Sequence, residues 1–298
     1  MKTIKQRISY AVMGLIAMGF TACTQNEDMT PTLKGQEINA TFSVGGMQTR
    51  VNTLGHGNNW EDKDKLKVRI FTDYDYDPGS TAILSFNGET WSRNSSFRWL
   101  GESDHTILAV YPSSDDYDPS HLVYELPTNQ SSLEDLKSAD LIIGHWYGSP
   151  YSYVTIPMQH RMSMVTIVYH VGTADHPNMD ISEPQVYSKN TSVNFNIDQD
   201  QRQFVMSTPS GNPAWVQACK HDGDMFSAIV IPGSYIKDER FLKFKIGDKN
   251  FYAKMKINTD FEEGKRYTYK LDVGKDIVKL TQISVDDLTG WTNEDDLK

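Results

Sequence analysis

The stretch LKFKIGDKNFYAKMKI, residues 242–257, decides the fold class because its apolar residues recur at every second position. Leu242, Phe244 and Ile246 alternate with lysines, and residues 251–257 repeat the alternation. A period of two places the apolar side chains on one face of a strand and the charged ones on the other. Each segment is therefore predicted to be a strand with one buried and one solvated face, which is typical of antiparallel sheets.

The same period continues along the chain. It is clear at 38–44 and 267–273, and further strands are predicted at 66–72, 81–86, 105–111, 121–126, 153–156, 162–171, 192–197, 203–206 and 226–231. The most apolar of these, 162–171, is expected to lie at the centre of its sheet. One helix is predicted, from the capping box Ser131-Ser132-Leu133-Glu134 to Ser138. The chain is therefore predicted to be all-β and built from antiparallel β-sandwiches.

The length of 298 residues suggests two domains, at about 100–200 residues each. Gly172, Pro177 and Pro184 interrupt the strand pattern around a polar segment. We therefore expect an N-terminal sandwich at 36–175 and a C-terminal sandwich at 176–298. Residues 23–35 contain Pro31, have no periodicity and are predicted to be a linker.

The first 22 residues have the features of a secretory signal peptide, with a basic start and an apolar run of ten residues at 11–20. A membrane-spanning helix needs about 20 apolar residues. The run ends in Phe20-Thr21-Ala22-Cys23, which resembles the lipobox of bacterial lipoproteins. The resemblance implies lipidation of Cys23 and anchoring in the outer membrane; the alternative is an ordinary signal peptide with an incidental cysteine.

The net charge of −10 argues against nucleic acid as a partner, because phosphate binding needs clustered lysine and arginine. With Cys23 assigned to lipid, Cys219 alone forms neither a disulfide nor a zinc site. Cys219 and His221 would share one face of a strand, but a nucleophilic cysteine also needs an orienting group. A core thiol is the favoured interpretation.

Two acidic loops are candidate calcium sites. Residues 73–79 have the alternate aspartates of an EF-hand loop, but Pro78 and Leu84 stand where that loop needs glycine and glutamate. Residues 115–118 form the second loop. Solvated loops are the favoured interpretation, and no metal or cofactor is predicted.

His160 and His170 lie ten residues apart on one predicted strand and would face the same side. Core or edge histidines with satisfied hydrogen bonds are favoured over a pair of metal ligands. No phosphate-binding glycine loop and no Gly-x-Ser-x-Gly motif occurs. We predict no catalytic residues, and a secreted hydrolase is the weakest of the functions considered.

A series of short motifs occurs along the chain in a set order: Thr49-Arg50, Trp60 to Asp64, Leu66 to Val68, Ala109 to Pro112, Ser138 to Ile142, Ile156 to Ser163, Ala228 to Gly233, Phe261 to Tyr269, and Ile283 to Trp291. In this order the motifs resemble the fimbrillin-like family of Gram-negative anaerobes, the type V pilins and their accessory subunits. The resemblance implies two transthyretin-like β-sandwich domains in a pilus subunit at the cell surface. It also implies export as a lipoprotein, proteolysis after arginine or lysine, and polymerisation with other pilin subunits by strand exchange.

For the proteolytic cut, the resemblance indicates the bond between Arg50 and Val51. Glycines and asparagines flank this bond, and chain flexibility admits proteases. The alternative is a plain loop arginine. A cut here would release the strand at 38–44, whose alternate apolar side chains would leave an open groove and an unpaired edge.

The C-terminal segment 276–291 is the candidate donor strand. Val278 and Leu280 alternate with polar residues, as do Ile283 and Val285, and the phase slips at 281–282, which predicts a bulge or a break. The competing interpretation, given nearly equal weight, is that this segment completes the sandwich of its own chain.

The alternative function is a monomeric, glycan-binding surface lipoprotein. It would use Trp91, Trp99, Tyr147 and Tyr151 as exposed platforms on which sugar rings stack. A host protein or glycan could also be the partner of a pilus subunit, and the sequence leaves open whether the subunit belongs to the stalk, the tip or the anchor.

Overall fold

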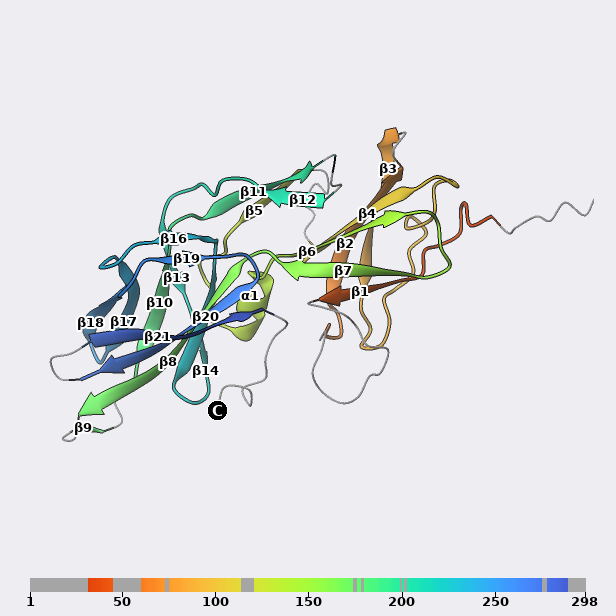
Figure 1. The fold of residues 1–298 in the computed structure, drawn as a ribbon. Coiled ribbons are helices and arrows are strands. Elements are labelled where there is room, and N and C mark those ends of the chain that lie inside the picture. The colour runs from red at the N-terminus through yellow and green to blue at the C-terminus, as the bar shows by residue number, and fades with distance from the viewer. Residues whose placement is uncertain are drawn as a thin grey trace, which may run out of the picture. The chain divides into compact units, whose positions relative to one another are not determined.

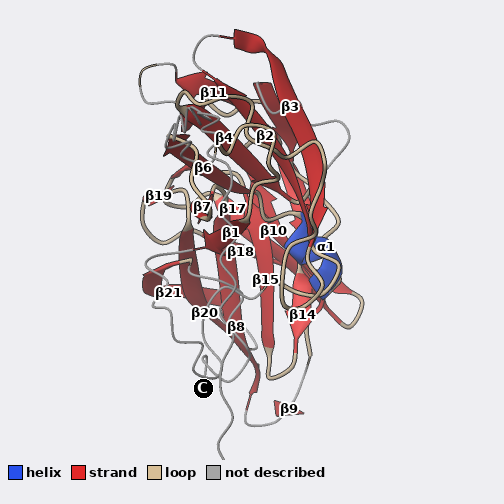
Figure 2. Ribbon diagram, turned by 90° about the vertical axis from the view of Figure 1, so that its right-hand side faces the viewer, coloured by secondary structure: helices blue, strands red, loops and turns tan. Residues whose placement is uncertain are grey.

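The computed structural model describes residues 32–44, 60–72, 75–113, 121–173, 176–177, 180–198, 200, 203–274 and 278–288. Strands dominate this part of the chain, and its one helix is the short α1 (Figure 2). The predicted all-β class is confirmed. No helix in the described ranges is long and apolar enough to span a bilayer.

The N-terminal half forms a six-stranded sheet in the order β1-β7-β6-β4-β2-β3 (Figure 1). Its strands are β1 (Ala40–Val44), β2 (Lys65–Thr72), β3 (Asp75–Ser85), β4 (His105–Tyr111), β6 (Ile142–Gly148) and β7 (Val154–His160). In β2, Leu66, Val68 and Ile70 are fully buried while the residues between them are at least partly exposed, as the alternation predicts. These side chains pack with Phe42 and Trp99 in one hydrophobic core.

A second large sheet has the order β14-β15-β8-β20-β21. Its strands are β8 (Ser163–Thr173), β14 (Cys219–His221), β15 (Met225–Val230), β20 (Lys265–Val273) and β21 (Val278–Asp287), with β9 (His176–Pro177) attached to β8. The predicted central strand is confirmed, because β8 pairs with β15 on one side and with β20 on the other. The sheets are mainly antiparallel, but β1 with β7 and β8 with β20 are parallel pairs.

Smaller sheets complete the fold. They contain β13-β10-β17-β18, β12-β11-β5 and β16-β19. Their strands are β5 (His121–Glu125), β10 (Ser182–Ser188), β11 (Ser192–Asp198), β12 (Gln203–Met206), β13 (Ala214–Gln217), β16 (Gly233–Tyr235), β17 (Arg240–Ile246), β18 (Lys249–Lys254) and β19 (Thr259–Phe261). The inward side chains of these sheets and of the β8 sheet form the second core.

The helix α1 (Leu133–Ser138) is present as predicted, but its capping box is Ser132 with Asp135, one residue beyond the predicted pair Ser131 and Glu134. The side chain of Ser132 accepts a hydrogen bond from the backbone N–H of Asp135, and the Asp135 carboxylate accepts one from the backbone N–H of Ser132. Leu136 is buried and anchors the helix in the second core.

Strands that precede position 175 in the sequence are hydrogen-bonded to strands that follow it. β5 pairs with β11, and β8 pairs with β15 and β20, so two strands expected in an N-terminal sandwich belong to sheets with C-terminal strands. The sheets therefore do not divide at the expected boundary between 36–175 and 176–298. The number of separate sandwich domains stays a prediction.

Two predictions about residues 153–171 are wrong. The strand expected to end at Ile156 continues through Pro157 to His160 as β7. His160 and His170 do not share a strand, because the chain turns at Arg161 and Met162 before β8 begins. His160 is buried, and His170 is exposed.

Candidate assembly strands

The strand β1 lies at the end of its sheet in the described part of the chain and pairs with β7 alone. Ile38, Phe42 and Val44 are buried, with Phe42 only 1% exposed, and Ala40 is partly buried. The expected inward face of this segment is thus occupied as the alternation predicts. Thr41 on the other face accepts a hydrogen bond from the Tyr153 hydroxyl at 2.9 Å.

The seat of β1, which is the apolar surface on which Phe42 packs, consists of the aromatic side chains Trp60, Trp91 and Tyr111. The Phe42 and Trp91 rings meet edge to face at 5.2 Å, and Trp60 contacts Trp91 and Tyr111 at the same centroid distance. The Trp60 indole N–H donates to the carbonyl of Phe42 at 2.8 Å. Removal of β1 would therefore expose a ready-made apolar groove beside the free edge of β7.

The strand β21 lies at the end of the second large sheet and pairs with β20 alone among the described strands. It is continuous, and a register shift opposite Thr268 and Tyr269 leaves Ile283 unpaired. The expected bulge is therefore present, one residue beyond its predicted position.

The four candidate donor residues fall on opposite faces of β21. Leu280 is 2% exposed and Val278 is packed against the core, whereas Ile283 and Val285 are 59% and 46% exposed. In the structure, then, β21 belongs to its own chain's sheet and leaves two β-branched side chains in solvent. Whether it also serves as a donor stays a prediction.

The other site residues named from the sequence lie outside the described ranges. They are Cys23, Arg50 and Val51. The side chains of both acidic loops also fall outside the described residues, while within them no cluster of three or more metal-ligating side chains occurs.

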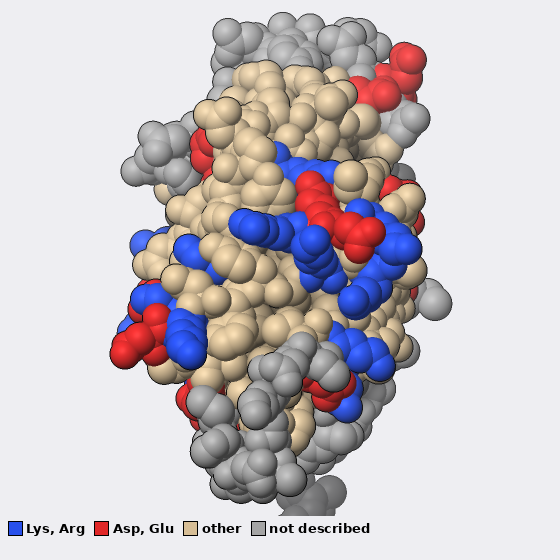
Figure 3. Space-filling view, turned by 90° about the vertical axis from the view of Figure 1, so that its left-hand side faces the viewer, with Lys and Arg blue, Asp and Glu red and all other residues tan. Residues whose placement is uncertain are grey.

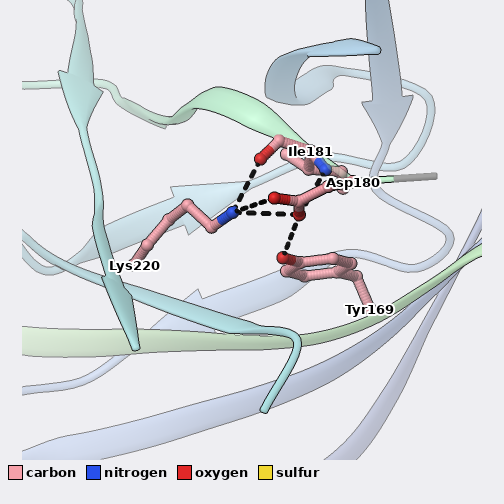
Figure 4. Close-up of polar contacts among 4 residues, drawn as sticks. All are labelled: Tyr169, Asp180, Ile181 and Lys220. Carbon is pink, nitrogen blue, oxygen red and sulfur yellow. Dashed lines mark hydrogen bonds and ion pairs between the residues drawn. The ribbon is translucent and has the colours of Figure 1, made fainter. Parts of the chain in front are cut away.

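A polar cluster next to Cys219 joins β8, β10 and β14 (Figure 4). The Lys220 ammonium lies 2.9 Å from both carboxylate oxygens of Asp180 and 2.9 Å from the carbonyl of Ile181, and the Tyr169 hydroxyl donates to Asp180 at 2.8 Å. The hydrogen bond from Lys220 lowers the pKa of Asp180. Burial, and then the hydrogen bond to Asp180, raises the pKa of Tyr169. These contacts hold the residues that directly precede β10 against β8 and β14.

Cys219 is buried, and burial raises the pKa of its thiol. A raised pKa disfavours the thiolate that a nucleophile requires. Cys219 and His221 share β14 as expected. The favoured interpretation of Cys219 as a core thiol fits this environment.

Asp140 and His160 form a buried pair that joins two of the short motifs named above. This contact was not predicted from the sequence. Asp140 follows α1, and its carboxylate lies 2.7 Å from Nδ1 of His160 at the end of β7, with both side chains almost completely buried. Asp140 and His160 stand twenty residues apart, and the β6–β7 hairpin brings them together. Nothing in the spacing of the two motifs predicts the contact.

The proposed sugar-stacking residues do not form one platform. Trp99 is 2% exposed and belongs to the core, which corrects its expected exposure. Trp91 packs against Phe42 in the seat of β1. Tyr147 and Tyr151 are exposed, at 39% and 67%.

Comparison with known proteins gives one family. A model described as fimbrillin-like matches residues 49–289. A candidate cell adhesion protein from Bacteroides ovatus has a similar structure, with a TM-score of 0.63 at 15% identity, over 87% of this chain and 99% of that one. A candidate cell adhesion protein from Bacteroides uniformis gives a TM-score of 0.57 at 17% identity, over 77% of this chain and 93% of that one. No curated protein sequence matches the chain.

Proposed function

Because the chain belongs to the fimbrillin-like family, we propose that it is a subunit of a cell-surface pilus that is exported as a lipoprotein and joined to other subunits by strand exchange. In this proposal Cys23 carries the lipid that holds the protein in the outer membrane. Proteolysis between Arg50 and Val51 then frees β1, and β21 of one subunit fills the place that β1 leaves in another.

The observation that carries the proposal is the exposure of Ile283 and Val285 on an edge strand. Solvent-exposed β-branched side chains on an edge strand are an aggregation hazard, and soluble proteins usually protect such strands with charge, proline or a covering loop. A strand that must bury these side chains in a partner has a reason to keep them.

Both β1 and β21 present alternate apolar side chains. Phe42 and Val44 are two residues apart on β1 and both point into the core, and Ile283 and Val285 have the same spacing. Burial of each aliphatic side chain contributes about 1.5–3 kcal/mol, and backbone hydrogen bonds to the edge of β7 add to it. Among the described strands β21 pairs with β20 alone, so its release breaks one strand pair.

The test is the double substitution Ile283→Asp with Val285→Asp. Both side chains are exposed, so we expect a folded monomer with an unfolding free energy within about 1 kcal/mol of the parent. After incubation with a trypsin-like protease, the parent should give a polymer ladder on a non-boiled gel and the double variant should not. Val205→Asp with Ile257→Asp is the matched control, because these side chains are 42% and 56% exposed on other segments and should leave the ladder intact.

A double variant that polymerises like its parent, or that unfolds, would refute the assignment of β21 as donor. A parent that stays monomeric under all protease conditions would instead favour the alternative of a monomeric, glycan-binding surface lipoprotein.

The first two maturation steps have their own tests. Cys23→Ala should abolish labelling by radioactive palmitate and move the protein out of the membrane fraction. Edman sequencing of protein shed from cells should begin at Val51, and a mature N-terminus at Cys23 would contradict the cut.

A further inference from the structure

The outer face of the sheet β13-β10-β17-β18 carries a group of aromatic and basic side chains, of which Tyr187 also packs against the second core. Along these strands Val186, Val216, Leu242 and Phe244 point inward and are at most 1% exposed. The residues that alternate with them point outward. They include Tyr187, Trp215, Lys243, Lys245 and Tyr252.

The aromatic members form a connected row. The rings of Tyr187 and Trp215 are 5.1 Å apart, and those of Trp215 and Tyr252 are 6.1 Å apart. Two strands, β10 and β17, separate β13 from β18, which is roughly 14 Å at about 4.8 Å per strand. The side chains of Trp215 and Tyr252 must therefore lean toward each other across the middle of the sheet, where they form a shallow apolar strip.

Positive charge surrounds this strip. The guanidinium carbon of Arg240 lies 4.5 Å from the ring centre of Tyr252, and Lys243 is the direct cross-strand neighbour of Tyr252. Residues 237–256 contain seven lysines and arginines against three acidic residues, in a chain whose net charge is −10. On the side of the molecule where β17 and β18 lie, basic side chains outnumber acidic ones (Figure 3).

Part of this charge is free for a ligand. Lys245 pairs with Glu183 at 2.7 Å. Within the described residues, Lys243 and Lys254 have no ion-pair partner. Lysines on β18 also protect an edge strand from pairing with other chains, but that function does not require an aromatic row beside them.

We propose that this face binds an acidic polysaccharide, a glycan whose sugar rings carry carboxylate or sulfate groups. The C–H face of a sugar ring is apolar and carries partial positive charge, so it stacks on the electron-rich face of Trp215 and contacts the Tyr252 ring beside it. Arg240, Lys243 and Lys254 then lie beside the strip, where they attract the anionic substituents. An extended chain suits a flat strip that crosses four strands better than a compact anion does.

The inference does not rest on strand exchange. None of its residues lies on β1 or β21, and their side chains are on the outer face of another sheet, so variants of this face should polymerise like the parent chain. Failure of one proposal is therefore distinguishable from failure of the other.

The experiment measures binding of the purified chain to polygalacturonate and to heparin by affinity electrophoresis. Highly methyl-esterified polygalacturonate is the matched neutral ligand, because it keeps the sugar backbone and loses the charge. We expect binding to both anionic glycans, at least tenfold weaker binding to the esterified one, and weakening as salt rises from 50 to 300 mM.

Two variants separate the roles of the strip and of the charge. Tyr252→Ala, at a side chain that is 37% exposed, and Lys243→Gln with Lys254→Gln should each weaken binding at least tenfold without unfolding the chain. The control pair Lys65→Gln with Lys279→Gln changes exposed lysines elsewhere and should bind within twofold of the parent.

Three results would overturn the proposal. The first is that the chain binds neither polygalacturonate nor heparin. The second is that both face variants bind these glycans as tightly as the parent chain does. The third is that the parent chain binds polyglutamate as tightly as it binds the anionic glycans and that Tyr252→Ala leaves the binding of polyglutamate unchanged. The last result would identify a general anion-attracting surface or a docking face for an acidic protein.

Discussion

Loss of β1 should remove a large part of the stability of the N-terminal sheet. Ile38, Phe42 and Val44 are 6%, 1% and 5% exposed. At about 1.5–3 kcal/mol for each buried apolar side chain, the three contribute roughly 5–9 kcal/mol. This is comparable to the total unfolding free energy of about 5–15 kcal/mol that is typical of a folded protein.

The prediction is tested by comparing the full chain with a chain that begins at Val51. Urea unfolding followed by tryptophan fluorescence should show an early transition in the shorter chain, because Trp60 and Trp91 report on the vacated groove. A synthetic peptide with the sequence of residues 36–46 should restore the parent transition when added in excess. In the full chain, Phe42→Ala alone should cost about 3–5 kcal/mol.

Asn39→Ala is the matched control, since this exposed side chain precedes β1 and its loss should change the unfolding free energy by less than about 0.5 kcal/mol. An unfolding transition of the shorter chain that coincides with that of the full chain would refute the reasoning. It would mean that the side chains around the vacated position of β1 repack with little loss of unfolding free energy.

Three further predictions follow from single sites. Gly144→Ala should destabilise the chain by about 1–3 kcal/mol, because a Cβ there would lie 2.1 Å from the sulfur of Met158; an unchanged melting temperature would contradict this overpacking. Burial lowers the pKa of His105 and His145, so below pH 6.5 the unfolded chain binds protons that the folded chain does not. The free energy of unfolding should therefore fall as the pH is lowered from 7.5 to 5.5, by at most about 1.4 kcal/mol per pH unit for each histidine. In the double variant His105→Gln with His145→Gln this pH dependence should disappear, and a pH dependence that persists would contradict the role of these histidines. In a Cys23→Ala chain, the thiol of Cys219 should react with iodoacetamide at pH 8 only after urea is added, and rapid labelling of that folded chain would show that the thiol is accessible.

Strands with clean alternation could be predicted from the sequence almost to the residue. β12 has the expected bounds, β5 ends one residue before its expected end at Leu126, and α1 ends at Ser138 as expected. In these segments one face meets the core and the other meets water, so the local pattern and the tertiary environment agree.

The strands that were missed contain residues that locally favour a break. Pro184 lies inside β10, although the sequence predicts a boundary there, and a register shift between Ser182 and Gln185 accommodates it. Pro157 lies inside β7 in the same way. Here the packing of the whole sheet overrides the local preference.

The site was less predictable than the fold, because it depends on which segments meet. Alternation indicated that Phe42 and Val44 would be buried, but not that β1 would run parallel to β7. The row of Tyr187, Trp215 and Tyr252 comes from three strands and has no signature in the linear sequence.

The parallel pairing of β8 with β20 sets the order in which the chain can fold. Met164 pairs with Arg266, about 100 residues further along, and the partner on the other side, β15, lies about 60 residues along. Contacts of such long sequence separation form slowly, because the loop between them must close first. Both edges of β8 therefore stay unpaired until β15 is available, and one edge stays unpaired until β20 is available. A subunit delivered N-terminus first would spend that interval vulnerable to pairing with other chains, and this favours a helper that shields β8 until β20 is available.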